Sequence, residues 1–343
     1  MSFRIIKKVP SGDEIIKQLP LTEKQYKNIE IHRKEIRNIL AGRDNRLLII
    51  VGPCSAWPYD AVLEYANRLI KVDKKVKNKL KIVMRSYVQK PRTVTGWAGP
   101  INQPDPLRPP NIANGLYYAR KLMLEITNKN LAIADEALFT NNSHSFLELL
   151  SWVAIGARST ENQEHRIFAS SLDFPVGMKN PTSGSIKTGV NGVIAAQYRH
   201  TAIFDGYEVE TSGNRFAHLV LRGGNNKPNY GLEYLEQAKH YLEIAQIKNP
   251  SVIVDVSHDN CLINGVKEYK KQGEIIFEVI NIIKQNPQLA KIIKGFMLES
   301  FIKEGRQDIN NLSSIDINGL SITDPCLGWE QTNDILLKLA RIC

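Results

Sequence analysis

Short apolar runs alternate with amphipathic helical stretches along most of this 343-residue chain. Eight of these runs are rich in β-branched residues, and each ends in a polar or charged residue before the next helical stretch begins. Strands that are apolar on both faces are typical of parallel sheets covered by helices. The runs are 47–54, 81–87, 131–136, 152–158, 175–179, 218–222, 251–258 and 291–300. This alternation predicts an α/β protein folded as a (β/α)8 TIM barrel.

Two segments lie outside the alternation. Residues 1–40 are expected to form an N-terminal extension with one amphipathic helix over 22–40, which leaves 41–343 as the catalytic barrel domain. The segment 187–217 is irregular, and its string AIFDGYEVETSGN predicts a β-hairpin inserted before the sixth barrel strand. An open doubly wound sheet is the alternative fold. It fits less well because no GxGxxG motif follows the first strand.

Composition excludes several other classes of protein. The chain is 43% hydrophobic and 23% charged, as ordinary globular domains are, and no run reaches the roughly 18 apolar residues of a membrane span. The first residues, MSFRIIKKVPSGDE, lack the apolar core of a secretory signal, so we expect a cytoplasmic protein with no membrane partner. The four cysteines form no CxxC pair and are expected to be reduced thiols.

The net charge of +10 fits a nucleic-acid surface, an anionic small molecule or plain solvation. No zinc-finger or RRM signature is visible, and no basic stripe is interleaved with aromatic residues, so we expect no nucleic-acid partner. A non-catalytic anion- or nucleic-acid-binding protein is the alternative from another functional class. Such a protein would bind unrelated DNA or RNA with a steep dependence on salt.

The strand ends indicate chemistry, because barrels carry their reacting groups at the carboxyl ends of the strands. In chain order these ends carry Cys54, Arg85, Glu136, Arg158, Lys179, Arg222, His258 and Glu299. Four of them are cations, and Lys90 and Arg92 follow on the loop after the second strand. Cations gathered at one mouth repel each other, so the cluster suits a ligand with two or more phosphate or carboxylate groups. The alternative is that each cation pairs with a local Asp or Glu.

A second set of residues suits a metal ion. Cys54, His258 and Glu299 are joined by Asp324 after the last strand. A thiolate, an imidazole and two carboxylates form a mixed site for Mn²⁺, Fe²⁺, Co²⁺ or Zn²⁺ rather than an all-oxygen cage. The alternative is that the buried Cys and His are structural. The metal hypothesis depends on the shared position that the barrel would give these residues.

Several motifs carry a family resemblance. GPCS (52–55), MRSYVQKPRT (84–93), GARSTENQEHR (156–166), DVSH (255–258), MLES (297–300) and SITDPCLGWE (321–330) occur in this order. Over roughly residues 15–340 the chain resembles class I 3-deoxy-D-arabino-heptulosonate 7-phosphate (DAHP) synthases of the long bacterial and yeast type. The resemblance implies a (β/α)8 barrel that condenses phosphoenolpyruvate with erythrose 4-phosphate. This reaction releases phosphate and opens the shikimate pathway of aromatic amino acid biosynthesis. A homodimer or homotetramer is also implied.

The resemblance assigns roles to residues of this chain. The expected ligands of one divalent metal ion are Cys54, His258, Glu299 and Asp324. The expected phosphoenolpyruvate clamp is Arg85, Lys90, Arg158, Lys179 and Arg222, and the aldose-phosphate site includes Pro91, Arg92 and Thr93. The expected catalytic residues are Lys90, Glu136 and Lys179. Lys90 would protonate the aldehyde oxygen, and Glu136 would activate a water molecule.

The chain departs from the family pattern mainly around the second substrate. Ala-Trp-Pro stands at 56–58 where the family has a residue and then His-Asp, and Ala98 replaces a lysine. The basic residue expected shortly after DVSH is missing, with Leu262 and Ile263 in that region. A paralogue that joins phosphoenolpyruvate to another aldehyde or sugar phosphate is therefore the alternative enzyme. The hairpin near 199–213 is shorter than usual, so we expect weak or absent feedback inhibition by aromatic amino acids.

Overall fold

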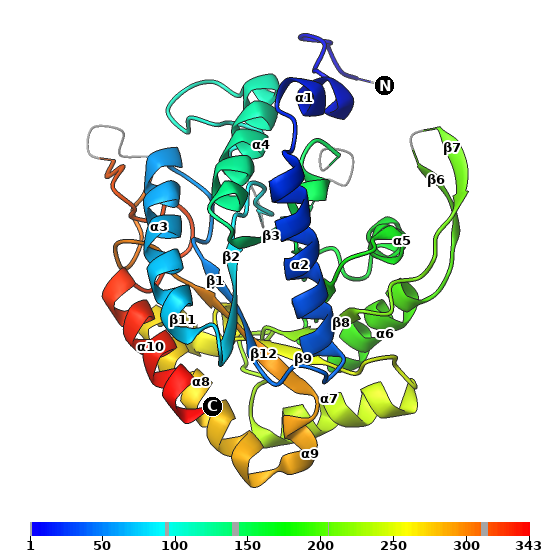
Figure 1. Cartoon of the computed structure of the whole chain (residues 1–343), viewed down its shortest axis with the longest axis vertical. Helices are drawn as coiled ribbons and strands as arrows, with labels where there is room; N and C mark the ends of the chain where they lie inside the picture. Colours follow the sequence, from blue (N-terminus) through cyan, green and yellow to red (C-terminus); the bar gives the residue numbers. More distant parts are fainter. Residues whose placement is uncertain (1, 93–95, 139–143, 205, 310–314) are drawn as a thin grey trace.

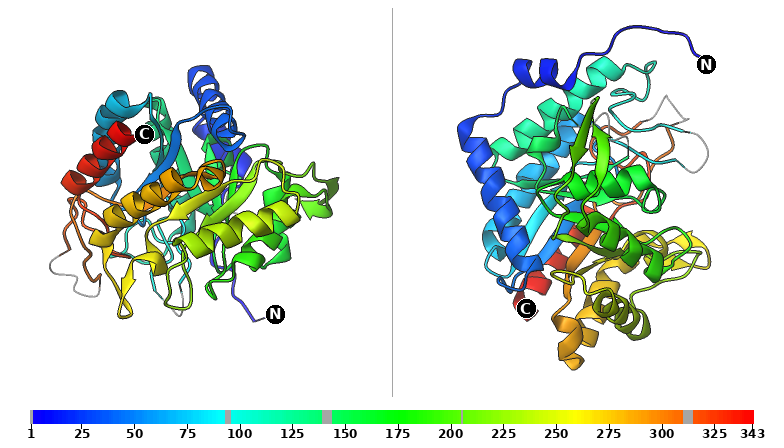
Figure 2. Two further views of the ribbon diagram at one scale, coloured as in Figure 1. Left: turned by 90° about the horizontal axis from the view of Figure 1, so that it is seen from below. Right: turned by 90° about the vertical axis from the view of Figure 1, so that its right-hand side faces the viewer.

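Eight parallel strands close into a barrel in the order β1-β12-β9-β8-β5-β4-β3-β2, with helices around the outside (Figures 1 and 2). The computed structural model describes residues 2–92, 96–138, 144–204, 206–309 and 315–343. The barrel strands are β1 (Leu47–Gly52), β2 (Leu80–Arg85), β3 (Ala132–Ala137), β4 (Trp152–Ile155), β5 (Val176–Lys179), β8 (Ala217–Leu221), β9 (Val252–Asp255) and β12 (Ile293–Glu299). Each of the eight apolar runs overlaps one strand, so the predicted (β/α)8 barrel is confirmed.

The α-helices are α1 (Gly12–Gln18), α2 (Glu23–Leu40), α3 (Tyr59–Val76), α4 (Ile112–Asn128), α5 (Gln163–Ser171), α6 (Ile186–Gln197), α7 (Leu232–Ile244), α8 (Gln272–Gln285), α9 (Pro287–Ala290) and α10 (Trp329–Ile342). Within the described residues, seven of the eight barrel strands are followed by an α-helix, whereas β3 is followed by a short 3-10 helix (Leu147–Leu149), and α1 and α2 precede β1. None of the helices in the described ranges is long and apolar enough to cross a membrane.

Two small antiparallel hairpins are added to the barrel. β6 (Thr201–Phe204) and β7 (Tyr207–Glu210) form the predicted hairpin before the sixth barrel strand, and it extends away from the body of the molecule (Figure 1). The second hairpin, β10 (Leu262–Ile263) with β11 (Val266–Lys267), follows β9 and was not predicted. It lies at the carboxyl end of the barrel, where it contributes to the site described below.

Side chains alternate between two apolar layers. Residues on the outer strand faces pack against the helices in one large cluster, and those on the inner faces fill the barrel. The inner layer includes Val83, Trp152 and Met297, each almost fully buried. Gly295 allows β12 to approach β1, because a Cβ atom there would lie 1.8 Å from the Leu48 carbonyl oxygen. The barrel is therefore a filled core rather than a pore.

Helix α2 closes the amino-terminal end of the barrel. It begins after Thr22, whose hydroxyl accepts from the Gln25 amide while the Gln25 side chain accepts from the Thr22 amide. Its apolar residues Ile36, Ile39 and Leu40 join the inner layer and are at most 1% exposed. The helix predicted over 22–40 is thus confirmed, and it covers the starts of the strands.

A polar pair lies inside the barrel. The Trp152 indole N–H donates to His218 Nε2 over 3.1 Å, and His218 Nδ1 lies 2.9 Å from the Phe216 carbonyl oxygen. This pattern requires a neutral ring with its proton on Nδ1. Burial lowers the pKa of His218 to about 4, and the bond to Phe216 opposes the shift only in part.

His218 should make stability fall in acid. Between pH 6.5 and about 4 the unfolded chain binds a proton that the native protein excludes, so the free energy of unfolding decreases as the pH falls, by a total on the order of 3 kcal/mol. We expect His218→Gln to reduce this pH dependence in urea unfolding at pH 4.5 to 7.5. His144→Gln, at an exposed histidine beside Asp13, is the control. Equal pH slopes for wild type and His218→Gln would contradict the prediction.

Candidate active site

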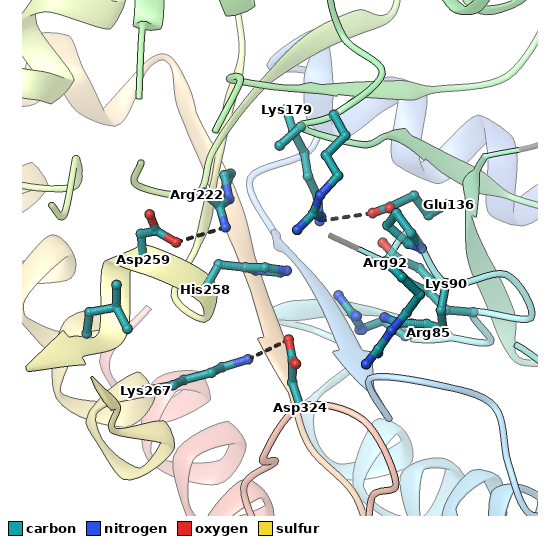
Figure 3. A pocket seen from close by; sticks show the side chains of 15 residues that line it. Arg85, Lys90, Arg92, Glu136, Lys179, Arg222, His258, Asp259, Lys267 and Asp324 are labelled. Atoms are coloured by element: carbon teal, nitrogen blue, oxygen red, sulfur yellow. Dashed lines mark hydrogen bonds and ion pairs between the residues drawn. The ribbon is translucent and has the colours of Figure 1, made fainter. Parts of the chain in front are cut away.

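A polar cavity of about 450 Å³ opens at the carboxyl ends of the barrel strands (Figure 3). We call it the main cavity. Its wall includes ten of the residues singled out from the sequence: Arg85, Lys90, Pro91, Arg92, Glu136, Arg158, Lys179, Arg222, His258 and Asp324. Cys54 and Glu299 lie behind the wall with no exposed surface. Thr93 lies outside the described residues.

Strand geometry places these side chains. Inward-facing residues alternate along each strand, so the last inward residue of each strand points into the mouth. Arg85 and Lys179 are the last residues of β2 and β5, and Glu299 is the last residue of β12. Gly156 makes room for Glu136, because a Cβ atom at Gly156 would lie 2.7 Å from the Glu136 carboxylate. The barrel thus gathers residues that are far apart in the sequence.

Arg85, Arg222 and Lys179 each have a carboxylate partner. Arg85 Nη2 lies 3.0 Å from Glu299 Oε1 and Arg222 Nη2 lies 3.0 Å from Asp259 Oδ1. Lys179 Nζ lies 3.2 Å from a Glu136 oxygen and 3.5 Å from an Asp255 oxygen. The wall carries seven basic side chains and three carboxylates, and Glu299 and Asp255 behind it bring the carboxylates to five. The site therefore keeps a net positive charge.

Two guanidinium groups retain unused donors. Arg85 Nη1 and Arg222 Nε are buried and have no hydrogen-bond partner among the residues that the structure covers. Arg85 is held in place by the Tyr87 ring, with its guanidinium carbon 4.0 Å from the ring centroid. A buried donor without a partner is costly. These two arginines can therefore donate hydrogen bonds to an anion that enters the cavity.

Three of the four predicted metal ligands come together. Cys54 Sγ and carboxylate oxygens of Glu299 and Asp324 all lie within 4.8 Å of one another. Burial and the two carboxylates raise the pKa of the Cys54 thiol, although Lys90 opposes this. Metal binding would displace the thiol proton to solvent, and a thiolate with two carboxylates is a donor set that fits a divalent transition metal.

His258, the fourth predicted ligand, lines the same cavity (Figure 3). Its Nδ1 lies 2.9 Å from Asp255 Oδ2, a close contact without hydrogen-bond geometry. Burial lowers the pKa of His258, although Asp255 opposes the shift. A neutral imidazole with Nδ1 beside a carboxylate keeps its other nitrogen for a ligand. His258 also has a left-handed backbone, with φ of 54°, which is uncommon for a residue other than glycine.

Glu136 and Lys90 are held in defined protonation states. Burial alone would raise the pKa of Glu136, but Lys179 and Lys90 outweigh it and hold the pKa below its ordinary value. The Lys90 ammonium donates to the Cys54 carbonyl over 2.8 Å and lies 3.1 Å from Cys54 Sγ. Burial works against this ammonium, but the acidic groups around it raise the pKa of Lys90 overall. The cavity thus presents an ionised carboxylate and a charged amine to any ligand.

One basic residue of the wall was missed. The sequence reading found no cation shortly after DVSH, and this was wrong: β11 carries Lys267 into the cavity. Its ammonium contacts Glu299 Oε2. It also lies 3.3 Å from Asp324 Oδ2 (Figure 3). The signal was present in Asn264-Gly265, a pair typical of tight hairpin turns. Asp255 and Asp259, partners of Lys179 and Arg222, were also missed.

A second polar cavity of about 450 Å³ adjoins the first. We call it the side cavity, and it shares Arg92 and Asp324 with the main cavity. Arg306 lies on its wall between two anchored neighbours, since Gly305 pairs with Cys326 and the Gln307 amide donates to the Ser321 carbonyl. Two arginines in connected cavities suit a second anionic group.

Comparison with known proteins places the chain among enzymes of one kind. Residues 18–337 match the sequence profile of the DAHP synthetase I family. A Trp-sensitive phospho-2-dehydro-3-deoxyheptonate aldolase of Buchnera aphidicola is 42% identical over 307 residues, which are 88% of this chain and 85% of the relative. The Tyr-sensitive aldolase of Escherichia coli K12 is 41% identical over 88% of this chain and 83% of its own length.

A solved structure shares the fold. The phospho-2-dehydro-3-deoxyheptonate aldolase of Francisella tularensis SCHU S4 superposes with a TM-score of 0.92 at 36% sequence identity. The match covers 99% of this chain and 98% of the other. Fold and sequence comparisons therefore agree over nearly the whole barrel.

The Arg85–Glu299 pair should contribute to stability as well as to the site. We expect Arg85→Met to lower the free energy of unfolding by about 3 kcal/mol, because it leaves a buried carboxylate short of one partner. The double change Arg85→Met with Glu299→Gln should cost less than the sum of the single changes. Urea unfolding followed by circular dichroism measures both.

Arg108→Met is the matched control, because Arg108 pairs with Asp105 at 3.8 Å on the surface and is 81% exposed. Such a pair contributes about 1 kcal/mol or less. Equal losses for Arg85→Met and Arg108→Met would contradict the assignment of Arg85 to a buried, coupled pair.

Proposed function

The chain belongs to the DAHP synthetase I family, and on that basis we propose that it condenses phosphoenolpyruvate with erythrose 4-phosphate in the main cavity. The products are 3-deoxy-D-arabino-heptulosonate 7-phosphate and inorganic phosphate. The reaction is the first step of aromatic amino acid biosynthesis.

Two observations support this proposal most directly. The cavity wall has seven basic side chains, and Arg85 and Arg222 each have a hydrogen-bond donor without a partner among the described residues. Phosphoenolpyruvate has a carboxylate and a phosphate, which together need several cations and hydrogen-bond donors. Arginine binds either group through two parallel N–H bonds, and lysine adds a point charge. We assign the clamp to the cations on the wall of the main cavity: Arg85, Lys90, Arg158, Lys179 and Arg222.

One divalent metal ion completes the site. Cys54, Glu299 and Asp324 supply three ligands and His258 the fourth, and the donor set suits Mn²⁺, Fe²⁺, Co²⁺ or Zn²⁺. When bound, the metal polarises the aldehyde and orients it for attack. The requirement for a thiolate fits the free cysteines of the chain, and we propose that the enzyme works in the reducing cytoplasm.

Lys90 is placed to serve carbon–carbon bond formation. The methylene carbon of phosphoenolpyruvate attacks the aldehyde carbon, and the aldehyde oxygen becomes an alkoxide that takes up a proton. The Lys90 ammonium lies 3.1 Å from Cys54 Sγ. Because Cys54 is a proposed metal ligand, this ammonium lies beside the site at which the metal would orient the aldehyde. It donates a hydrogen bond to the oxygen and then the proton.

Glu136 serves the second half of the reaction. Attack leaves positive charge on the former enol carbon, and water adds there before phosphate leaves. Glu136 is ionised and therefore accepts a proton from this water. Lys179, 3.2 Å away, holds the carboxylate in position while contacting the substrate. Bringing two mutually repelling anions together in one positive cavity provides much of the rate enhancement.

Exposed apolar residues support a homodimer or homotetramer. On the β6–β7 hairpin Ile203 is 79% exposed and Tyr207 is 73% exposed, and near the N-terminus Ile5 and Ile6 are more than 80% exposed. Exposed apolar groups of this kind are typical of surfaces that bind another protein chain.

The reaction is tested by phosphate release from phosphoenolpyruvate. With Mn²⁺ and a thiol reductant we expect turnover of erythrose 4-phosphate, loss of activity on chelation, and recovery when Mn²⁺ is restored. Arabinose 5-phosphate should react much more slowly. A protein that turns over another aldose but not erythrose 4-phosphate would instead be the paralogue that the altered loops suggest. The Glu136→Gln variant is the inactive control.

Arg306 should help to bind the aldose phosphate. We expect Arg306→Ala to raise the KM for erythrose 4-phosphate about tenfold, the loss of one charge-assisted hydrogen bond, and to leave the KM for phosphoenolpyruvate within twofold. Arg341→Ala is the control, because Arg341 lies near the end of α10 away from the mouth. Unchanged constants, or equal changes for both substrates, would remove Arg306 from the substrate site.

A further inference from the structure

We propose that Lys267 is a positioning residue of the metal centre. Its ammonium holds Glu299 and Asp324 together in the metal-free enzyme and is displaced when a divalent cation binds. This inference rests on the metal-dependent function proposed above. It concerns a residue outside the ligand set and a state that the reaction itself does not use.

The contacts of Lys267 place it between two ligands. Its ammonium contacts Glu299 Oε2 and lies 3.3 Å from Asp324 Oδ2. Glu299 Oε2 also accepts from the Ser257 hydroxyl over 2.7 Å, and Glu299 Oε1 accepts from Arg85. Oε2 therefore has two donors, which is its full complement of lone pairs. A metal ion can use this oxygen only after one donor has left.

Charge explains why a cation stands there. Glu299 has no exposed surface, and its carboxylate would repel that of Asp324 across a cluster only 4.8 Å wide. The Lys267 ammonium removes this repulsion and keeps both side chains in the ligand position. A divalent cation supplies more positive charge to the same oxygens. Ammonium and metal ion then repel each other, so they compete for the position.

The hairpin explains how Lys267 can move while the ligands stay. Glu299 lies on a barrel strand with neighbours on both sides, whereas Lys267 ends a hairpin of two residues per strand. The turn residues Asn264 and Gly265 have φ of 51° and 78°, as a tight turn requires. Val266 is 69% exposed and Ile263 is 46% exposed, so little packing holds the hairpin down. A four-carbon side chain on such an element can swing toward solvent once a divalent cation takes over its carboxylate partners.

Metal binding to the whole enzyme tests the proposal without substrate. Titration calorimetry with Mn²⁺ on chelator-treated protein should give an affinity at least tenfold higher for Lys267→Met than for wild type. Lys267→Arg keeps the competing charge and should bind Mn²⁺ within threefold of wild type. Thermal denaturation gives a second readout: without metal, Lys267→Met should melt below wild type, and saturating Mn²⁺ should raise its melting temperature by more.

The outcomes separate the alternatives. Lys270→Met is the matched control, since Lys270 lies three residues on and pairs with Glu304 at the surface, and it should leave both readouts unchanged. Weaker or equal Mn²⁺ binding by Lys267→Met would overturn the proposal and would assign Lys267 to supporting the bound metal. If Lys267→Met does not fold, Lys267→Gln is measured in its place. Wild-type protein that binds no Mn²⁺ would overturn this inference together with the metal requirement, whereas tight binding without turnover of erythrose 4-phosphate would contradict only the proposed substrate.

Discussion

Closure of the parallel sheet is the constraint on which the rest of the structure depends. Strands that are apolar on both faces bury one face against helices and the other against each other inside a closed ring. All eight strands then end at one rim, so the last inward residue of each strand meets the others. Cys54 and His258 are about 200 residues apart in sequence and reach one site for this reason alone.

Charges at that rim are arranged in opposed pairs with a surplus of cations. Glu299 and Asp255 each hold basic groups in place while remaining fully buried. Removing either carboxylate would leave ammonium and guanidinium groups repelling each other in a poorly solvated space. The acidic residues therefore hold the basic side chains close together by ion pairing before an anionic ligand binds. An anionic ligand would neutralise the surplus of cations and would accept hydrogen bonds from the unused donors of Arg85 and Arg222.

The sequence allowed the fold and most of the site to be predicted. Strand runs and their last residues follow from local periodicity, which is why Arg85, Lys179 and Glu299 could be named in advance. Lys267 was missed, because the apolar residues Leu262 and Ile263 drew attention away from the Asn264-Gly265 turn, and because the direction in which a hairpin points is not encoded locally. Pairing was equally hidden, since nothing in the sequence links Arg222 to Asp259 rather than to another carboxylate. Such choices depend on angles between elements that local patterns do not encode.

The seal that α2 forms has a kinetic meaning. With Ile36, Ile39 and Leu40 filling one end of the barrel, everything that reacts enters and leaves through the opposite mouth. Arg85 and Lys179 are buried on the wall of the main cavity, and Arg306 is exposed on the wall of the adjoining side cavity. A ligand at Arg85 and Lys179 can therefore be reached only from this one opening. A passage closed at one end thus makes depth, alongside affinity, a factor in the order in which ligands bind and leave.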